Sequence, residues 1–385
     1  MNFETHIPTQ FIFGAGRRHE IARLVAGWGR RCLIVSGKDG RRGEWLTRQL
    51  TDSGLHILHA QVTAEPTLTV IEEIARQVRG SKINFIIGSG GGAVIDAAKA
   101  VAGLVPNRRP LLDYLEVIGS GRKLEHPAKP WLAVPTTGGT GAEATQNAVI
   151  SVPERGVKAS LRHPSLFARA AVIDPELTLS LPPSLTATTG MDALTQLIEA
   201  YVSARANPFT DALCAEGVRL VARSLTVSFH HGGDLAARTE LSLAAWWSGI
   251  ALAQAGLGAA HGFAAPIGGK FPDIPHGGVC AALLAPVMLA NIQALSSRQP
   301  SHPALARYRD IAVWLTGKNS AAAADGVARA RELVAELKIP RLSAYGITAA
   351  DHDSLIVSAR QASSMKSNPV ELTTGELKKI LTDAW

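Results

Sequence analysis

The chain has 385 residues, of which 46% are hydrophobic and 18% are charged, and its formal net charge at pH 7 is +7. This length is too great for one ordinary core and this composition excludes disorder, so we expect two globular domains. The positive charge does not predict nucleic-acid binding, because the basic residues form scattered doublets such as Arg17-Arg18 and Arg108-Arg109 without interleaved aromatic residues.

The amino-terminal residues and the cysteines both indicate a reducing compartment. The start, MNFETHIPTQFIFGAG, has neither the basic segment nor the continuous apolar segment of a secretory signal, so we expect a cytoplasmic protein. The three cysteines, Cys32, Cys214 and Cys280, lie far apart and form no CxxC motif. We interpret each as a small buried apolar residue.

The predicted secondary structure changes in kind near residue 180. Up to about residue 180, runs rich in Val and Ile end in Gly, Pro or Thr and alternate with helical stretches, which predicts a parallel sheet wrapped by helices. The predicted strands are 31–37, 84–92, 131–137 and 170–175. After the breaker Pro182-Pro183 the chain is predicted to be helical at 190–204, 208–229, 234–255, 277–293, 303–316, 320–337, 348–361 and 374–384. We therefore expect an α/β domain at 1–180 and an all-helical domain at 181–385.

One long apolar stretch, residues 241–269, has the length of a membrane span. Gln254 and several glycines interrupt it. A continuous apolar run is what a spanning helix needs. We predict a buried helix and no membrane partner.

Two turns in the first half are rich in glycine and threonine. The strand of IIGSGGGAVIDAAKA, 86–100, runs into Gly90-Gly91-Gly92 and then a helix, a sequence that suits either a phosphate at the helix N-terminus or a purely structural tight turn. It is not the GxGxxG fingerprint, which argues against a plain Rossmann domain. The second turn, VPTTGGTGAEAT at 134–145, offers the hydroxyls of Thr136, Thr137 and Thr140. Both turns follow predicted parallel strands, so together they favour a nucleotide site at one edge of the sheet.

Candidate metal ligands gather in the second half. Asp192 and Gln196 are four residues apart in a predicted helix, so their side chains share one face, although a neutral amide is a poor ligand. His261 and His276 lie in glycine-rich, nearly uncharged sequence beside predicted helix ends. One carboxylate and two imidazoles suit a borderline divalent metal with an open position for substrate.

Several ordered motifs resemble those of the iron-containing (group III) alcohol dehydrogenases. PTQFIFGAG is similar to that family's first strand and turn, GGGAVIDAAK to its GGGSxxDxxK loop, PTTGGTGAEAT to its PTTxGTGSE loop and GMDALTQLIEAY to its GMDALxHxxE helix. The closing SNPVELTTGELKKILTDAW is similar to the family's usual end. The resemblance covers essentially the whole chain.

The resemblance implies an α/β dinucleotide-binding domain, an all-helical domain and an active site in the cleft between them, an architecture shared with dehydroquinate synthase. It implies a pyrophosphate on Gly90, Gly91, Gly92 and Ala93, a nicotinamide side near Thr136, Thr137 and Thr140, cofactor neighbours at Asp96 and Lys158, and metal ligands at Asp192, Gln196, His261 and His276. The usual partner in that family is a small alcohol or aldehyde, and the usual assembly is a homodimer or larger homo-oligomer.

Three departures from the family pattern bear on these assignments. Gln196 stands where the family has His, Ala265 stands where many members have a further His suspected of relaying protons, and Ala93 and Ala142 replace serines. Relatives resembling glycerol dehydrogenase hold zinc with one Asp and two His. Others, the maleylacetate reductases, use no metal.

We therefore predict a nicotinamide-dependent alcohol dehydrogenase or aldehyde reductase with zinc or iron, in which Asp192, His261 and His276 are catalytic. The alternatives are a metal-free reductase like maleylacetate reductase, a lyase like dehydroquinate synthase and a non-enzymatic binding module. The lyase needs many Lys and Arg residues that the helical half does not present.

The coenzyme prediction depends on CLIVSGKDGRRGEW, 32–45. Family members restricted to NAD often carry Asp after this strand, where it binds the ribose hydroxyls and repels a 2′-phosphate. Here Gly37 takes that position and Lys38, Arg41 and Arg42 follow. The repulsion is gone and cations are near, so we expect NADP to be preferred over NAD, with Gly37 and Lys38 in the cofactor site.

Overall fold

The computed structural model describes residues 2–39 and 43–385. Arg41 and Arg42 of the coenzyme prediction therefore lie outside the described residues. The chain divides into two compact units. The sheet unit comprises Ile7–Thr137 and Gly141–Thr178, and the helical unit comprises Leu179–Trp385 with Gly138–Thr140 and the amino-terminal residues up to His6. Two short segments thus pack with the helical unit although they lie far from it in the sequence.

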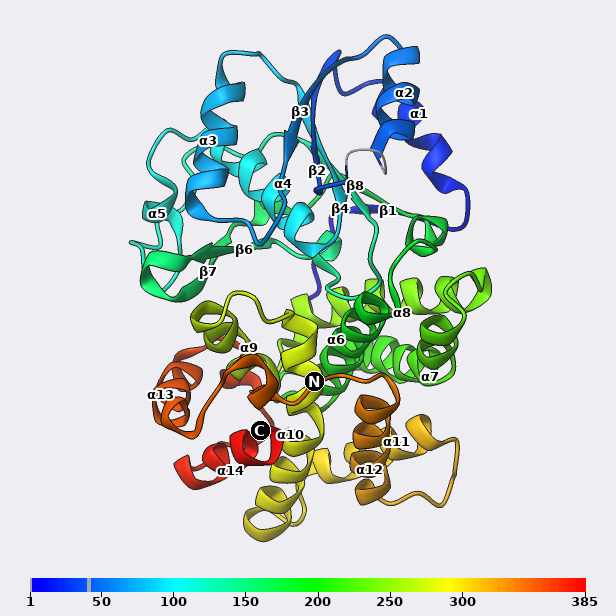
Figure 1. Cartoon of the computed structure of the whole chain (residues 1–385), viewed down its shortest axis with the longest axis vertical. Helices are drawn as coiled ribbons and strands as arrows, with labels where there is room; N and C mark the ends of the chain where they lie inside the picture. The colour runs from blue at the N-terminus through cyan, green and yellow to red at the C-terminus, as the bar shows by residue number, and fades with distance from the viewer. Residues whose placement is uncertain (1, 40–42) are drawn as a thin grey trace. The chain divides into compact units, whose positions relative to one another are not determined.

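The sheet unit is built on a parallel sheet, drawn in blue, cyan and green in Figure 1. Within the described residues the strands are β1 (Gln10–Phe13), β2 (Arg31–Ser36), β3 (His56–Gln61), β4 (Phe85–Gly90), β5 (Trp131–Pro135) and β8 (Ala170–Ile173), in the order β1-β8-β5-β4-β2-β3. Every pairing in this sheet is parallel. An antiparallel hairpin of β6 (Asn147–Val152) and β7 (Val157–Arg162) accompanies it.

Helices cover both faces of this sheet, and the sequence of β2 shows why. Its side chains alternate, so Leu33 and Val35 enter one core while Cys32 and Ile34 enter the other. The first core is completed by α3 (Leu68–Arg79) and α4 (Gly92–Leu104), and the second by α1 (Ile21–Val25) and α2 (Glu44–Asp52). A short helix, α5 (Leu111–Tyr114), also contributes to the first core. The parallel α/β architecture, predicted from the alternation of apolar runs with helical stretches, is confirmed.

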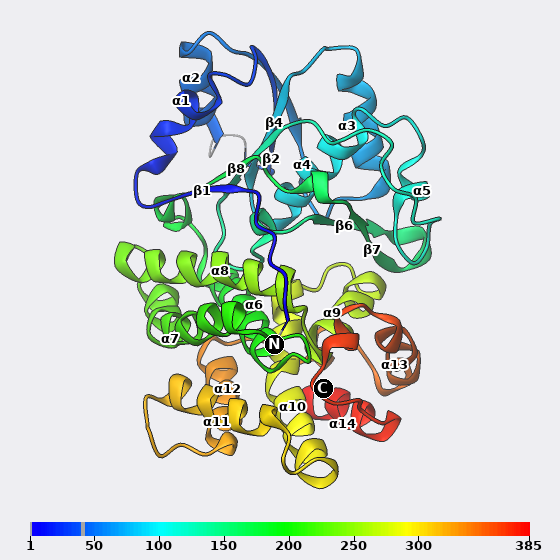
Figure 2. The same ribbon diagram turned by 180° about the vertical axis from the view of Figure 1, so that it is seen from behind.

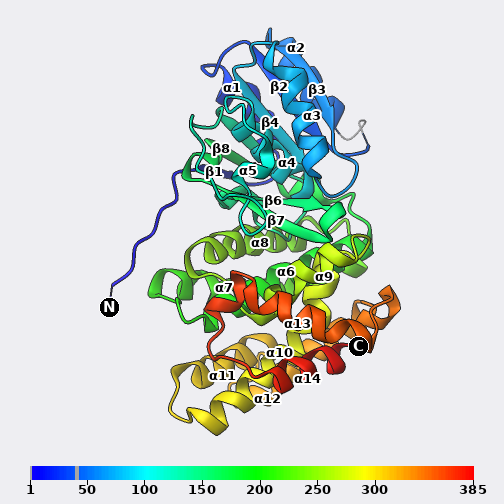
Figure 3. The same ribbon diagram turned by 90° about the vertical axis from the view of Figure 1, so that its left-hand side faces the viewer.

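The helical unit forms one continuous apolar core. Its helices are α6 (Pro183–Val202), α7 (Pro208–His230), α8 (Leu235–Ala255), α9 (Ala259–Lys270), α10 (His276–Arg298), α11 (Pro303–Thr316), α12 (Ala323–Glu336), α13 (His352–Gln361) and α14 (Thr374–Ala384). Figure 2 shows α6, α7 and α8 side by side, and Figure 3 shows α12 and α14 beside α10. The helix α6 contacts α7, α8, α9, α10 and α11, so residues on its buried face meet several other helices.

Two helices differ most from the prediction. The helix α6 begins at Pro183, earlier than predicted, because proline is tolerated in the first turn, where its missing N–H has no intrahelical partner. The helix α9 was not predicted as a separate helix, because its glycines and Pro266 lower helix propensity. Burial of Phe263 and Ile267 in the core compensates for that low propensity.

The apolar stretch at 241–269 is not one helix, since α8 and α9 meet at an angle of 99°. Among the described residues, α10 by itself has the length and hydropathy of a span, but 83% of that window is buried inside the protein, as in the core helix of a globular unit.

Candidate metal and cofactor site

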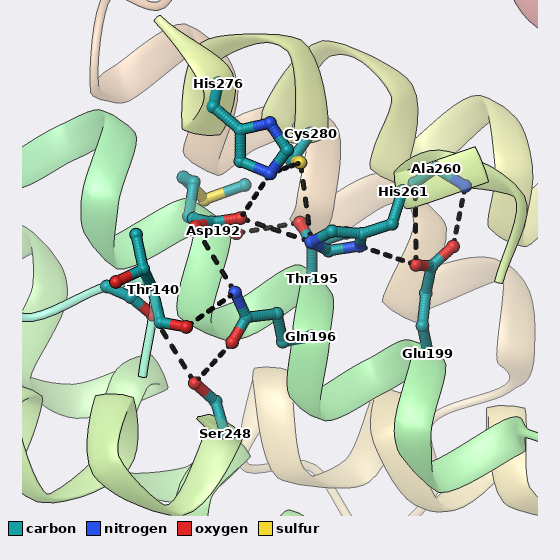
Figure 4. Close-up of polar contacts among 12 residues, drawn as sticks. Thr140, Asp192, Thr195, Gln196, Glu199, Ser248, Ala260, His261, His276 and Cys280 are labelled. Carbon is teal, nitrogen blue, oxygen red and sulfur yellow. Dashed lines mark hydrogen bonds and ion pairs between the residues drawn. The ribbon is translucent and has the colours of Figure 1, made fainter. Parts of the chain in front are cut away.

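One face of α6 carries three buried polar side chains. Asp192, Gln196 and Glu199 follow one another at helical spacing, and each has no more than 3% of its surface exposed. Buried polar groups are costly unless they are paired. Their partners come from α8, α9, α10 and the loop at Gly138–Thr140, as Figure 4 shows.

The two predicted histidines meet Asp192. Nε2 of His261, in the first turn of α9, lies 3.3 Å from Oδ1 of Asp192. Nε2 of His276, the first residue of α10, lies 3.8 Å from the same oxygen. The centroids of the two imidazole rings are 5.7 Å apart. The structure thus brings together the three residues that we predicted to be catalytic.

A glycine allows the start of α10 to come this close to α6. A Cβ added at Gly277 would lie 2.1 Å from the carbonyl oxygen of Thr188 and 3.1 Å from Cβ of Asp192. No other residue type fits without moving one helix away from the other. The glycine that follows His276 is therefore part of what places this imidazole beside Asp192.

Cys280 joins these residues, and our interpretation of it as a small buried apolar residue missed this. Its Sγ lies 3.6 Å from Nε2 of His261 and 3.7 Å from Nε2 of His276. Among the described residues, Asp192, His261, His276 and Cys280 form the group whose ligand atoms all lie within 4.8 Å of one another. The spacing of four between His276 and Cys280 was a signal for this, since it places both on one face of α10.

Gln196 lies beside this cluster and is held by hydrogen bonds. Its Nε2 donates to Oδ2 of Asp192 at 3.3 Å and, over 3.4 Å, to the carbonyl oxygen of Thr140. Its Oε1 accepts from Oγ of Ser248 at 2.7 Å. A carbonyl oxygen can only accept, so the contact with Thr140 fixes which end of the amide faces Asp192. Gln196 presents its donor end to the carboxylate, whereas a metal ligand would present oxygen.

Glu199 supports His261 from the side of the ring opposite Asp192. Its Oε2 lies 2.7 Å from Nδ1 of His261, and its carboxylate accepts the backbone N–H groups of Ala260 and His261. These amides belong to the first turn of α9, where backbone donors lack intrahelical partners. Glu199 thus anchors the start of α9 and orients the imidazole, although the sequence analysis gave it no role.

Charge within the cluster shifts its pKa values. Burial alone would raise the pKa of Asp192, but the hydrogen bond with His261 and the charge of His276 lower it. Burial opposes protonation of His261 and His276, yet the interactions with Cys280 and Asp192 raise the pKa of both imidazoles. The cluster therefore favours a bound cation, either protons or a metal ion.

In the sheet unit, the two predicted nucleotide turns emerge from neighbouring strands. Gly90 ends β4 and pairs with Pro135 of β5, and its carbonyl accepts the backbone N–H of Thr136 at 2.9 Å. Gly92 and Ala93 open α4, whose N-cap, Gly91, has no side chain to cap the helix. A Cβ at Gly91 would lie 3.3 Å from Cγ2 of Thr137. The backbone N–H groups of this turn therefore have no side chains over them, and a phosphate group can approach them closely.

The position after β2 lies at the same edge of the sheet. Ser36, the last residue of β2, pairs with Ser89 of β4, so Gly37 follows at the carboxyl end next to the glycine turn. The chain runs outward from β2 to β3 and then returns to β4, which makes β2 and β4 the switch point where open α/β sheets bind ligands. Lys38 is exposed there.

The remaining predicted cofactor residues form contacts within the protein. Oδ2 of Asp96 accepts the backbone N–H of Val149, and Nζ of Lys158 lies 3.1 Å from Oε2 of Glu65. Thr140 packs with the helical unit, where its carbonyl accepts from Gln196.

A buried lysine that the sequence analysis did not single out fixes the second turn. Nζ of Lys99 donates to the carbonyl oxygens of Ala142 and Asn147 and to Oγ1 of Thr145, and it pairs with Asp96. These bonds satisfy the buried ammonium group. They tie the stretch after Thr140 to α4.

Comparison with known proteins shows similarity over almost the whole chain. Residues 8–175 match the family model described as iron-containing alcohol dehydrogenase, and residues 186–385 match the model of the Fe-containing alcohol dehydrogenase family, C-terminal. Alcohol dehydrogenase 4 of Schizosaccharomyces pombe is 35% identical over 386 residues, covering 98% of this chain and 88% of the relative.

Solved structures share the fold. An alcohol dehydrogenase from Oenococcus oeni is 28% identical with a TM-score of 0.90, and the match covers 100% of both chains. The sulfoacetaldehyde reductase of Bifidobacterium kashiwanohense in complex with NAD+ is 25% identical with a TM-score of 0.86, covering 100% of this chain and 99% of the other.

Proposed function

The chain belongs to the iron-containing alcohol dehydrogenase family, and we propose that it transfers hydride between a nicotinamide and an alcohol or carbonyl carbon at a divalent metal held by Asp192, His261 and His276. It is an NAD(P)-dependent oxidoreductase acting on CH–OH groups. The names of its relatives favour a dehydrogenase over a lyase or a non-enzymatic binding module.

The observation that carries the metal proposal is the convergence of three ligand atoms from three helices. Oδ1 of Asp192 lies 3.3 Å from Nε2 of His261 and 3.8 Å from Nε2 of His276. Asp192 and His261 are buried, and His276 is partly exposed. One carboxylate with two imidazoles is a donor set that zinc and iron accept. These residues fit the group that the family name implies.

The metal ligands, Glu199 and the glycine turn have separate roles in the proposed reaction. A divalent metal supplies a Lewis acid that polarises the reacting C–O bond. Glu199 holds His261 in the tautomer that directs its Nε2 lone pair at the cluster. The turn at Gly90, Gly91 and Gly92, with Ala93 at the start of α4, binds the pyrophosphate through backbone N–H groups and the helix dipole.

We propose NADP as the preferred coenzyme, because Gly37 lacks a carboxylate to repel the 2′-phosphate and Lys38 is exposed beside it.

Zinc is our proposed metal, since it tolerates three protein ligands in catalytic sites. A cytoplasmic location and a homodimer or larger homo-oligomer stay predictions.

A metal-free reductase is the second candidate, and one observation favours it. Gln196, in the position of the family's His, forms hydrogen bonds with Asp192, Thr140 and Ser248 that need no metal. In that case His261 or His276 would donate the polarising hydrogen bond to the carbonyl.

The deciding experiment combines metal analysis with activity. Purified protein is analysed for bound metal and assayed with a panel of alcohols and aldehydes against NAD(H) and NADP(H). It is then stripped with chelator and titrated with zinc or ferrous iron. We expect turnover to fall on stripping and return with metal, and Asp192→Ala to lose both metal and turnover. Activity indifferent to chelation and to metal return would establish the metal-free reductase instead.

A further inference from the structure

We propose that Cys280 is a fourth metal ligand, which supplies as a thiolate the bond that the family's histidine would have made at position 196. This inference rests on the proposed function, because it assumes that Asp192, His261 and His276 hold a metal. It adds a residue type that the family pattern does not include among the ligands. It also makes the site one oxygen, two nitrogens and one sulfur.

The position of Cys280 suits this role. It lies one helical turn after His276 on α10, so both side chains leave the same face of the helix. Its side chain is 0% exposed. Its Sγ is almost equally far from the two imidazoles, at 3.6 Å from Nε2 of His261 and 3.7 Å from Nε2 of His276.

Four of the six separations among the ligand atoms are close to those between neighbouring ligands of a tetrahedral site. A substrate oxygen would then bind as a fifth ligand, an expansion that catalytic zinc allows. With about 2.0–2.1 Å from zinc to nitrogen or oxygen and about 2.3 Å to sulfur, tetrahedral ligands lie roughly 3.3 Å apart for nitrogen and oxygen and roughly 3.6 Å apart for nitrogen and sulfur. The observed separations are 3.3 and 3.8 Å from Asp192 to the two imidazoles, and 3.6 and 3.7 Å from Cys280. The same spacing also suits S–H···N hydrogen bonds, so the distances permit coordination and the experiment must separate the two states.

The hydrogen bonds of Gln196 leave the fourth position to another residue. Its donor end faces Asp192 and its oxygen accepts from Ser248. Using that oxygen as a ligand would require the amide to turn over and would leave its NH2 group without the carbonyl of Thr140. Cys280 reaches the cluster with no such change.

Charge balance supports the same assignment. Counted over the ligands alone, a divalent cation with two neutral imidazoles and one carboxylate retains a charge of about +1, and a thiolate brings the charge of this ligand set to zero. The thiol of Cys280 must lose its proton when the metal–sulfur bond forms, and that proton leaves to the buffer. A soft sulfur ligand also favours zinc over ferrous iron in direct competition.

The test uses cobalt(II) as a spectroscopic probe on the full chain after chelator treatment. A thiolate bound to cobalt(II) gives an intense near-ultraviolet charge-transfer band, which nitrogen and oxygen ligands do not give. We expect the band in the wild type and its loss in Cys280→Ser, with cobalt and zinc bound about tenfold or more weakly by the variant. Cys214→Ser is the matched control, because Cys214 is also a buried helix cysteine but lies on α7 outside the cluster.

A second measurement needs no variant. X-ray absorption of the zinc-loaded wild type should show a sulfur neighbour at about 2.3 Å in addition to the nitrogen and oxygen shell. Metal bound without this sulfur shell and without the charge-transfer band would overturn the assignment of Cys280 while the proposed function stood. Nicotinamide-dependent turnover by a protein that binds neither cobalt nor zinc would overturn both.

Discussion

Glu199 and His261 form a close pair in the helical unit, with Oε2 of the carboxylate 2.7 Å from Nδ1 of the imidazole. The other ring nitrogen faces Asp192 at 3.3 Å. A carboxylate at Nδ1 keeps the proton there and makes Nε2 a stronger ligand. Glu199 is therefore a positioning residue for the metal site.

Glu199→Gln should weaken metal binding by about 10–100-fold, as the loss of an outer-shell carboxylate commonly does. The amide can still accept the N–H of Ala260, so the helices should stay in place. Competition with a chelator measures the metal dissociation constant. Glu240→Gln, at an ion pair with Arg223 on the surface, should leave it unchanged. Equal metal affinity in both variants would remove the positioning role.

Gln196→His should tighten metal retention, because an imidazole at this position lies on the face of α6 that carries Asp192. We expect the zinc dissociation constant to decrease about tenfold or more. A change of this size in metal affinity is what the loss of an outer-shell partner commonly causes. Combined with Cys280→Ser, it should restore the affinity but not the cobalt–sulfur band. If neither single nor double variant binds zinc more tightly than its parent, position 196 does not reach the metal.

Gly277→Ala should separate His276 from Asp192, because the added Cβ would lie 2.1 Å from the carbonyl oxygen of Thr188. The start of α10 must then shift, and both metal affinity and the free energy of unfolding should decrease. Gly375→Ala, in a helix where an added Cβ meets nothing within 4 Å, should be neutral or slightly stabilising. Metal titration together with urea unfolding measures both effects. Identical behaviour of the two variants would contradict the close-approach explanation.

Gly37→Asp should move coenzyme preference from NADPH toward NADH. The nearest atom to an added Cβ is Cγ2 of Val94 at 3.8 Å, so the side chain has room. A hydrogen bond to a charged group contributes about 1.5–3 kcal/mol, and the ratio of kcat/KM values should therefore shift by about tenfold or more. Steady-state kinetics with both coenzymes measures it. Better kcat/KM with NADH in the wild type, unchanged in the variant, would reject our assignment of this position.

Glu143 should make the stability of the protein depend on pH. It is 4% exposed, and burial raises its pKa from the ordinary 4.5 to about 7, although Lys99 partly opposes the shift. Between these values the folded protein holds a proton that the unfolded chain has released, so the free energy of unfolding falls as pH rises. The full loss, reached above about pH 7, is about 3 kcal/mol.

Glu143→Gln should abolish that dependence, because an amide does not titrate. Urea unfolding at several values between pH 5 and pH 8 should show a steeper decline for the wild type than for the variant. Parallel curves would mean that Glu143 is charged or solvated in the folded protein.

Local pattern was sufficient for much of the fold and for three candidate ligands. The apolar run at 31–37 predicted a strand, and the alternation of such runs with helical stretches predicted a parallel sheet wrapped by helices. In the structure Cys32 and Ile34 enter one core and Leu33 and Val35 the other. Asp192 was a candidate because it lies four residues before Gln196 in a predicted helix, and this spacing alone places both side chains on one face. His261 and His276 were candidates because they lie in glycine-rich, nearly uncharged sequence. Charged or bulky neighbours would prevent close packing of the helices around them. Motif order was enough to indicate the family.

Tertiary packing decided what these residues contact. Whether Gln196 offers oxygen or nitrogen to Asp192 depends on the carbonyl of Thr140, 56 residues away. Glu199 reaches His261 across 62 residues, and Cys280 reaches it across 19. Such contacts depend on how α6, α9 and α10 pack, and that packing is set by the summed burial of many apolar side chains and by the bare backbone at Gly277. Sequence spacing fixes which face of a helix a side chain leaves, whereas only the packed core determines which atom it meets.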